Sequence, residues 1–254
     1  LSGHGADLQR LPPPMIPSHW FRRVVLVLCL MGLGAVILWV TGLATDPVTR
    51  PVTQAAGSVT FLFVFYATAP LTARFLAPLP SQDPELQERL ARIVATLPAC
   101  PPVTLHDHAD PQANSVGLLR RWSRIYLTTS LLNSMSDEGM RGVLAHESTH
   151  IREHHILATF LYASAFAVSS QLLADDNFFF AALLLFLGLR RYSEYRADAG
   201  AVAVVGRETL LTTLRELARS YPSKAWHRWT SFANIYPTLP MRIRAIETGR
   251  KALL

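Results

Sequence analysis

Residues 146–198 of this chain read HESTHIREHHILATFLYASAFAVSSQLLADDNFFFAALLLFLGLRRYSEYRAD. The stretch begins with two histidines four residues apart and continues through two apolar runs. It ends with Glu194 and Asp198, which are also four residues apart. Side chains at this spacing lie on one face of a helix. If the apolar runs form a helical hairpin, the two ends of the stretch return to the same side and their polar side chains can meet.

The histidine pair is typical of a metal site on a helix. Neutral imidazoles of His146 and His150 can share one Zn²⁺, and Glu147 between them can take a proton from an attacking water. A catalytic zinc also needs a third protein ligand, which Glu194 can supply, while Asp198 can accept the N–H of a ligand histidine. Two alternative interpretations stay open. The histidine motif can consist of surface polar residues on a helix, and Glu194 and Asp198 can form ion pairs with nearby arginines.

The composition places the apolar runs in a membrane. Half of the 254 residues are hydrophobic, only 17% are charged, and the mean hydropathy is +0.23. A soluble domain carries about 25% charged residues, and a disordered chain needs low hydrophobicity, so both classes are excluded. The net charge of +6 comes almost entirely from scattered arginines, which does not indicate a nucleic-acid partner. Two cysteines cannot form a disulfide framework.

About four spans are predicted, since a helix needs roughly 20 apolar residues to cross a bilayer. The candidate runs are residues 24–43, 58–76, 156–174 and the shorter 178–189. The last run is about a dozen residues long, so whether it crosses fully stays open. Arginines flank the spans on one side, and the positive-inside rule assigns that side to the cytoplasm.

The fold class predicted from these patterns is mainly α, with an α+β catalytic unit on a helical membrane protein. Within that unit we expect a helix over residues 83–97, strands at 103–105 and 125–128, and a helix capped by Ser136. No Pro or Gly interrupts residues 143–174, so this helix is expected to run straight into the third span. His154 and His155, on that continuation, are expected at the membrane interface or in solvent. The expected organisation is a flexible Pro-rich arm (1–18), a two-span hairpin (19–76), a cytoplasmic catalytic part (77–155), a second membrane hairpin (156–189) and a cytoplasmic helical part with the third zinc ligand (190–254).

The chain resembles the HtpX-like integral-membrane zinc metalloproteases, relatives of the CAAX prenyl proteases. The matching residues are Met135-Ser136-Asp137-Glu138 with Val143-Leu144-Ala145-His146, and the segment from Glu194 to Asp198. The resemblance extends from about Asp83 to Leu253. It implies a gluzincin-like domain with one Zn²⁺ per chain held by His146, His150 and Glu194, and with Glu147 as general base. It also implies a site on the cytoplasmic face of a membrane, here expected to be a prokaryotic plasma (inner) membrane.

Two further segments match the family less closely. The family has an Asn-containing edge segment that pairs with extended substrate, and Asn114 stands at the corresponding place, where a turn-forming Asn is the alternative. The family also has a His-Pro pair six residues before an Arg-Ile pair. Here Tyr236 replaces that histidine, so it is either a hydrogen-bond donor to an oxyanion or a packing residue. His227 and Arg242 are the other candidates for the donor.

These residues predict a membrane-embedded zinc endopeptidase that cleaves membrane proteins or membrane-proximal segments at the cytoplasmic face. Its partners would be a peptide or membrane-protein substrate and the lipid bilayer, and its oligomeric state stays open. One alternative is a dedicated processing protease for a single peptide or regulator. Another, from a different class, is an inactive zinc-bound membrane scaffold, although a structural zinc site needs no base such as Glu147.

Overall fold

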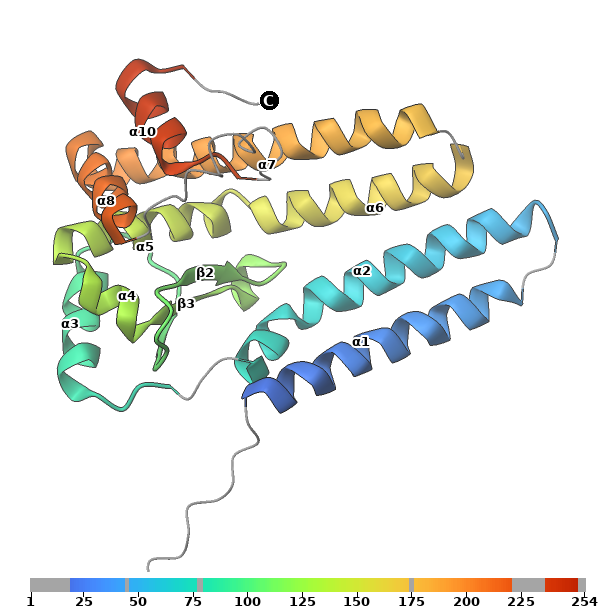
Figure 1. Cartoon of the computed structure of the whole chain (residues 1–254), viewed down its shortest axis with the longest axis horizontal. Coiled ribbons are helices and arrows are strands. Elements are labelled where there is room, and N and C mark those ends of the chain that lie inside the picture. The colour runs from blue at the N-terminus through green and yellow to red at the C-terminus, as the bar shows by residue number, and fades with distance from the viewer. Residues whose placement is uncertain (1–18, 44–45, 77–79, 174–175, 221–235, 251–254) are drawn as a thin grey trace, which may run out of the picture.

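The computed structural model describes residues 19–43, 46–76, 80–173, 176–220 and 236–250, so the arm predicted over residues 1–18 lies outside the described residues. Two helical hairpins extend in the same direction from a smaller part that contains a sheet (Figure 1). The helices are α1 (His19–Gly42), α2 (Thr49–Leu76), α3 (Pro84–Ala95), α4 (Thr129–Ser134), α5 (Asp137–Arg152), α6 (His155–Leu173), α7 (Asp176–Val205), α8 (Arg207–Ser220) and α10 (Leu239–Thr248), with a 3-10 turn at Arg120–Trp122. The strands are β1 (Val103–His106), β2 (Ala113–Val116) and β3 (Arg124–Thr128).

Three helices in the described part of the chain are long and apolar enough to cross a membrane, and they contain the segments Val24–Gly42, Thr49–Ala73 and His155–Leu173. Large apolar side chains on them face outward, as on a helix surrounded by lipid: Trp39 and Leu71 are each 68% exposed. The fourth predicted run, residues 178–189, is the first half of α7. It meets Arg190 and Arg191 before it reaches the length of a span. It nevertheless lies along α6, which packs against α2, so the two hairpins are side by side (Figure 1).

The prediction of one unbroken helix through residues 143–174 is wrong. Helix α5 ends at Arg152 and α6 begins at His155, because His154 adopts a left-handed conformation with a φ of 57°. Such a conformation costs about 1–2 kcal/mol for a residue other than glycine. Nothing in the local sequence forbids a continuous helix. Tertiary packing changes at this point, since α5 packs against the sheet, α7 and α8, whereas α6 packs mainly against α2 and also contacts α7.

The small sheet has the order β1-β3-β2, with β1 parallel and β2 antiparallel to β3. The strands predicted at 103–105 and 125–128 are confirmed as β1 and β3, and the predicted helix after residue 83 is α3, whose amide groups are capped by Asp83. Strand β2 is at the edge and lies beside α5. The core under the sheet consists of fully buried apolar side chains, among them Leu105, Ile125, Leu127, Leu132, Met140 and Leu144.

Helices α5 and α7 approach each other closely at a glycine. A Cβ added to Gly200 of α7 would collide with the methyl group of Thr149, which is fully buried on α5. The absence of a side chain at this position lets the two backbones come together. Glu194 lies less than two turns before Gly200 on α7, so the close approach also carries its carboxylate toward α5.

Candidate metal centre

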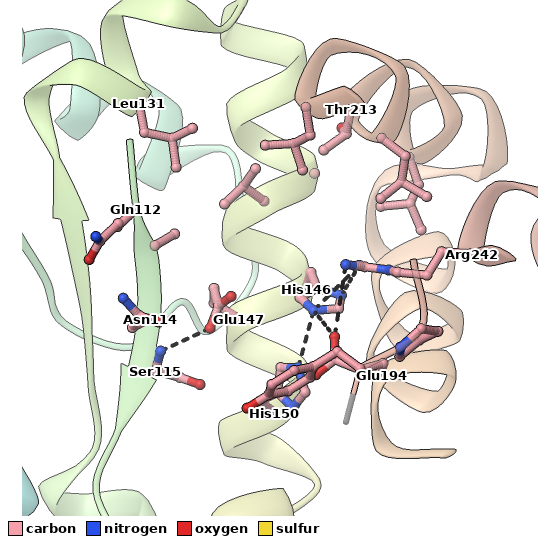
Figure 2. A pocket seen from close by; sticks show the side chains of 18 of the residues that line it. Gln112, Asn114, Ser115, Leu131, His146, Glu147, His150, Glu194, Thr213 and Arg242 are labelled. Atoms are coloured by element: carbon pink, nitrogen blue, oxygen red, sulfur yellow. Dashed lines mark hydrogen bonds and ion pairs between the residues drawn. The ribbon is translucent and has the colours of Figure 1, made fainter. Parts of the chain in front are cut away.

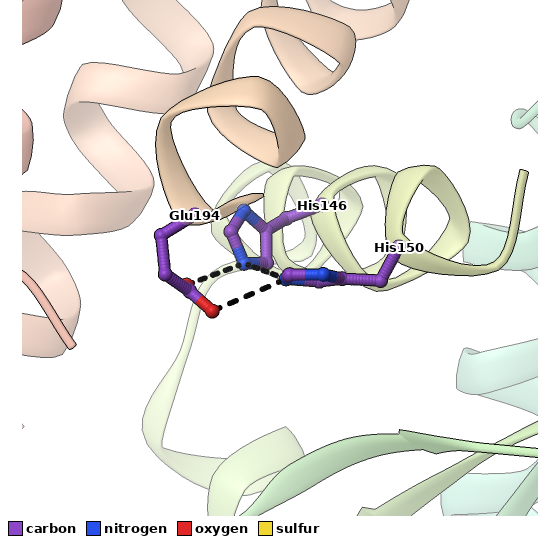
Figure 3. Close-up of side chains that lie close together, drawn as sticks. All are labelled: His146, His150 and Glu194. Carbon is purple, nitrogen blue, oxygen red and sulfur yellow. Dashed lines mark hydrogen bonds and ion pairs between the residues drawn. The ribbon is translucent and has the colours of Figure 1, made fainter. Parts of the chain in front are cut away.

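His146 and His150 from α5 meet Glu194 from α7 in a buried cluster (Figure 3). The two imidazole Nε2 atoms are 3.1 Å apart. The carboxylate oxygens of Glu194 lie 3.4 Å from Nε2 of His146 and 3.5 Å from Nε2 of His150. In a tetrahedral zinc site with Zn–N bonds of 2.0–2.1 Å, neighbouring ligand atoms are about 3.3 Å apart. The three side chains nominated by the sequence therefore converge with the spacing of zinc ligands, and their binding of zinc stays a prediction.

The other nitrogen of each imidazole has a partner on the side away from this cluster. Nδ1 of His146 lies 3.0 Å from Oδ1 of Asp198, and Nδ1 of His150 lies 2.8 Å from Nδ1 of His155. If each Nδ1 carries the ring proton, both Nε2 lone pairs point toward the carboxylate of Glu194. Three buried electron-pair donors facing one another would repel without a cation between them, so the donor set fits a divalent metal.

The charges of the metal-free cluster follow from burial and from hydrogen bonds. Burial and the neighbouring His146 lower the pKa of His150 to about 3, so its imidazole is neutral. Burial opposes ionisation of Glu194, but the hydrogen bond and positive charge of His146 lower its pKa to about 2. For His146, burial and Arg242 lower the pKa, yet the bonds to Asp198 and Glu194 outweigh them and raise it to about 9. A metal ion must therefore displace one proton, held by His146.

Arg242 of α10 fixes the carboxylate behind His146. Its Nε donates to Oδ2 of Asp198 at 2.9 Å and its Nη2 donates to Oδ1 at 2.5 Å. The third guanidinium nitrogen, Nη1, lies 3.8 Å from Oε2 of Glu194. Burial opposes ionisation of Asp198, but Arg242 and the hydrogen bond of His146 keep its pKa well below the usual range. The sequence suggested Arg242 only as an oxyanion donor, and its contact with Asp198 was missed because these residues are far apart in the chain.

Glu147 points away from the metal ligands and toward strand β2 (Figure 2). Its Oε2 accepts a hydrogen bond of 2.9 Å from the backbone N–H of Ser115. Loss of solvent around the carboxyl raises the pKa of Glu147 above its usual value. Asn114, the neighbouring residue, is exposed and belongs to β2 rather than to a turn, so the turn-forming interpretation is wrong.

These groups line a cavity of about 560 Å³ (Figure 2). Its polar half contains the histidines, Glu194, Glu147 and the free edge of β2, and its other end is apolar. The apolar lining includes Leu131, Val143, Leu210, Leu214 and Leu217. Tyr236 also lines the cavity and is 51% exposed, and its hydroxyl accepts a hydrogen bond of 2.6 Å from Arg190. His227 lies outside the described residues.

Comparison with protein families gives a match to the model of peptidase family M48 over residues 80–250. Among curated proteins, the chain is 24% identical to "Protease HtpX" of Mannheimia succiniciproducens over 191 residues, which cover 59% of this chain and 67% of that protein. It is 29% identical to "Protease HtpX" of Vibrio parahaemolyticus over 154 residues, which cover 49% of this chain and 54% of that protein. The chain thus spans between about half and two thirds of these relatives.

Among solved structures, the fold is similar to the crystal structure of S. mikatae Ste24p, with a TM-score of 0.57. The two chains are 21% identical, and the match covers 91% of this chain and 66% of the other. At this identity the likeness concerns the fold. Because the match covers 91% of this chain, it includes the hairpins as well as the part that contains the sheet.

Proposed function

Because the chain belongs to peptidase family M48, we propose that it is a membrane-anchored zinc endopeptidase. The observation that carries the proposal is the triangle of His146, His150 and Glu194, whose ligand atoms are 3.1–3.5 Å apart in a cavity that also contains Glu147. When bound there, zinc lowers the pKa of water and polarises a peptide carbonyl. Asp198 would hold His146 in the ligand tautomer through its Nδ1–H.

The chain's own residues supply the proton transfers and the orientation. Glu147 would take the proton of the attacking water and later pass it to the leaving amine. Its raised pKa suits this role, because a more basic carboxylate takes up the proton of the attacking water more readily. Tyr236 would donate a hydrogen bond from its hydroxyl group to the developing oxyanion. Its oxygen accepts a hydrogen bond from Arg190, which leaves the O–H proton available for the substrate.

The substrate chain would lie extended along β2. Successive residues of an edge strand direct their backbone groups alternately to the neighbouring strand and outward. The N–H of Ser115 reaches Glu147, so Ser115 and Ala113 present the outward groups beside the catalytic base. Asn114 would contact the same substrate backbone with its side chain. The apolar end of the cavity would accept a bulky apolar side chain next to the scissile bond.

The membrane helices restrict the class of substrate. The metal cluster lies where α5 gives way to α6, the helix that holds the third membrane-spanning candidate. A site beside the end of a membrane-spanning helix would be accessible to polypeptide segments that enter or leave the bilayer. We therefore propose membrane proteins and membrane-proximal segments as substrates, with the site on the cytoplasmic face of a prokaryotic inner membrane. The arginines that flank the predicted spans support this orientation.

The decisive experiment compares the parent with Glu147→Gln on a model membrane protein in proteoliposomes, with zinc content measured in both. We expect about one zinc per chain in each protein and cleavage by the parent alone, because Gln cannot accept the proton. Glu88→Gln makes the same chemical change at an exposed position of α3 and should cleave like the parent. Equal cleavage by Glu147→Gln and the parent would contradict the assignment of Glu147 as the base. A parent protein that contains no zinc would refute the proposed function.

The same assay separates the alternatives. Cleavage of several unrelated membrane proteins supports a broad proteolytic role, whereas a single defined cut in one protein supports a dedicated processing protease. A zinc-bound parent that cleaves no membrane substrate would support the scaffold interpretation. The position of Glu147 between the metal ligands and the substrate strand favours catalysis over a scaffold.

A further inference from the structure

His155 contacts the second metal ligand directly, although it lies outside the metal cluster. Its Nδ1 is 2.8 Å from Nδ1 of His150, and the two rings are nearly perpendicular, with an interplanar angle of 77°. The side chain is buried, with 8% of the residue exposed. A solvent-exposed position, one of the two expected for this residue, is therefore wrong, whereas His154 is exposed.

The break between α5 and α6 creates this contact. In a continuous helix the neighbour of His150 on the same face would be His154, four residues on, and His155 would point about 140° away. The left-handed conformation at His154 interrupts that register and puts His155 in the neighbouring position. His154 thus adopts a backbone conformation that is unfavourable for residues other than glycine. Backbone strain of this kind is common at functional sites.

The hydrogen-bond directions in this cluster follow from metal binding at Nε2 of His150. That nitrogen must offer a lone pair, so Nδ1 of His150 carries the proton and donates it to Nδ1 of His155. His155 then carries its own proton on Nε2, which lies 3.5 Å from Oε2 of Glu153. His150 is therefore fixed in the tautomer with its proton on Nδ1, and His155 in the tautomer with its proton on Nε2.

Glu153 is itself anchored to the helix that provides the third ligand. Arg196 of α7 donates from Nε and Nη2 to the two oxygens of Glu153, at 3.1 and 2.9 Å. Arg196 stands two residues after Glu194. The series Arg196, Glu153, His155 and His150 therefore connects α7 to α5.

We propose that His155 is a positioning residue of the metal centre, which, backed by Glu153, holds His150 in the tautomer and orientation that direct Nε2 at the metal. The arrangement parallels that of Asp198 behind His146, with an imidazole and a carboxylate in place of a carboxylate alone. Partners of this kind orient ligand imidazoles and increase their basicity. The inference rests on the proposed zinc site and concerns its affinity for metal.

The test measures zinc affinity of the full chain in detergent by competition with a chromophoric chelator. His155→Ala should weaken zinc binding about 10- to 100-fold, the usual effect of removing such a partner. His155→Asn restores an oxygen that accepts the Nδ1 proton of His150 and should recover more than half of the loss on a logarithmic scale. His154→Asn is the matched control: Asn tolerates the left-handed conformation, and the exposed site should leave the affinity unchanged.

A double variant tests the participation of Glu153. Glu153→Ala should weaken zinc binding in the parent, and this effect should disappear in the His155→Ala background, because Glu153 acts through His155. Full zinc affinity in His155→Ala would overturn the proposal. So would a folded His155→Asn that binds zinc no better than His155→Ala. If the alanine variant fails to fold, a folded His155→Asn whose zinc affinity lies about 10- to 100-fold below that of the parent overturns the proposal. A parent chain that binds no zinc would instead refute the proposed function.

Discussion

The pair formed by Asp198 and Arg242 offers a quantitative test of the site. The carboxylate side chain is 3% exposed and the guanidinium side chain 13% exposed, and they share two hydrogen bonds. Removing one partner of a buried ion pair costs about 3–5 kcal/mol, because the other charge stays buried. In Asp198→Ala the guanidinium loses both hydrogen bonds to the carboxylate, and its remaining neighbours are Glu194, at 3.8 Å, and Nδ1 of His146, at 3.0 Å. We therefore expect a loss of about 3 kcal/mol in the free energy of unfolding of the metal-free chain.

The same variant should weaken zinc binding about 10- to 100-fold, because His146 loses the acceptor of its Nδ1 proton. Denaturant titration in detergent micelles gives the first quantity, and chelator competition gives the second. Asp137→Ala is a suitable control, since Asp137 forms an ion pair with Arg89 at the exposed start of α5. An exposed pair of this kind contributes about 0–1 kcal/mol.

The double variant Asp198→Ala/Arg242→Met decides whether the two charges act as a pair. It removes both charges together, so its cost should be clearly smaller than the sum of the two single losses. Additivity within about 0.5 kcal/mol would mean that the two residues stabilise the fold independently. That result would refute the reasoning from the buried ion pair.

The remaining predictions concern the metal, its pH dependence, the helix contact and the oxyanion donor. Glu194→Ala should lose zinc at neutral pH, and full zinc occupancy measured by atomic absorption would contradict its role as third ligand. Burial lowers the pKa of His146, but bonds to Asp198 and Glu194 raise it to about 9. Zinc displaces that proton, so the apparent zinc affinity should rise about tenfold per pH unit from pH 7 and level off near pH 9; a flat profile in chelator competition would oppose this assignment. Gly200→Ala should destabilise the chain by about 1–3 kcal/mol in denaturant titration, because the new methyl group overpacks the contact between α5 and α7. Tyr236→Phe should lower kcat about 10²- to 10³-fold with little change in KM, and an unchanged kcat would reduce Tyr236 to a packing residue.

Local patterns predicted most of the helices. Apolar runs located three membrane-spanning candidates because lipid demands about 20 apolar residues, whatever the rest of the fold. The cap at Ser136 located the start of α5, since its hydroxyl accepts the N–H of Gly139 at 3.0 Å. The prediction of a continuous helix after residue 143 was wrong because no local pattern marks the end of α5. Neither Pro nor Gly marks the break at His154, which lies where the packing of the chain changes: α5 contacts the sheet and α8, α6 contacts α2, and α7 contacts both helices.

In the site, too, some features were predictable from the local sequence and others depend on tertiary packing. The spacings within 146–150 and 194–198 nominated the metal ligands and the base, because four-residue intervals put side chains on one helix face. The pairing of Arg242 with Asp198 and the contact of His155 with His150 had no such signal. The first pair joins segments 44 residues apart, and the second depends on a left-handed residue.

By itself the sequence indicated which residues are candidates for the chemistry, where the chain is apolar enough for lipid, and which helices present polar faces. Those properties depend on residue type and on helical periodicity alone. The tertiary structure decided the distances that bring Glu194 between the histidines, the residue that supports each imidazole, and the strand edge that faces Glu147. These depend on how α5, α7, α10 and β2 pack against one another, and such long-range packing leaves no periodic trace in the chain.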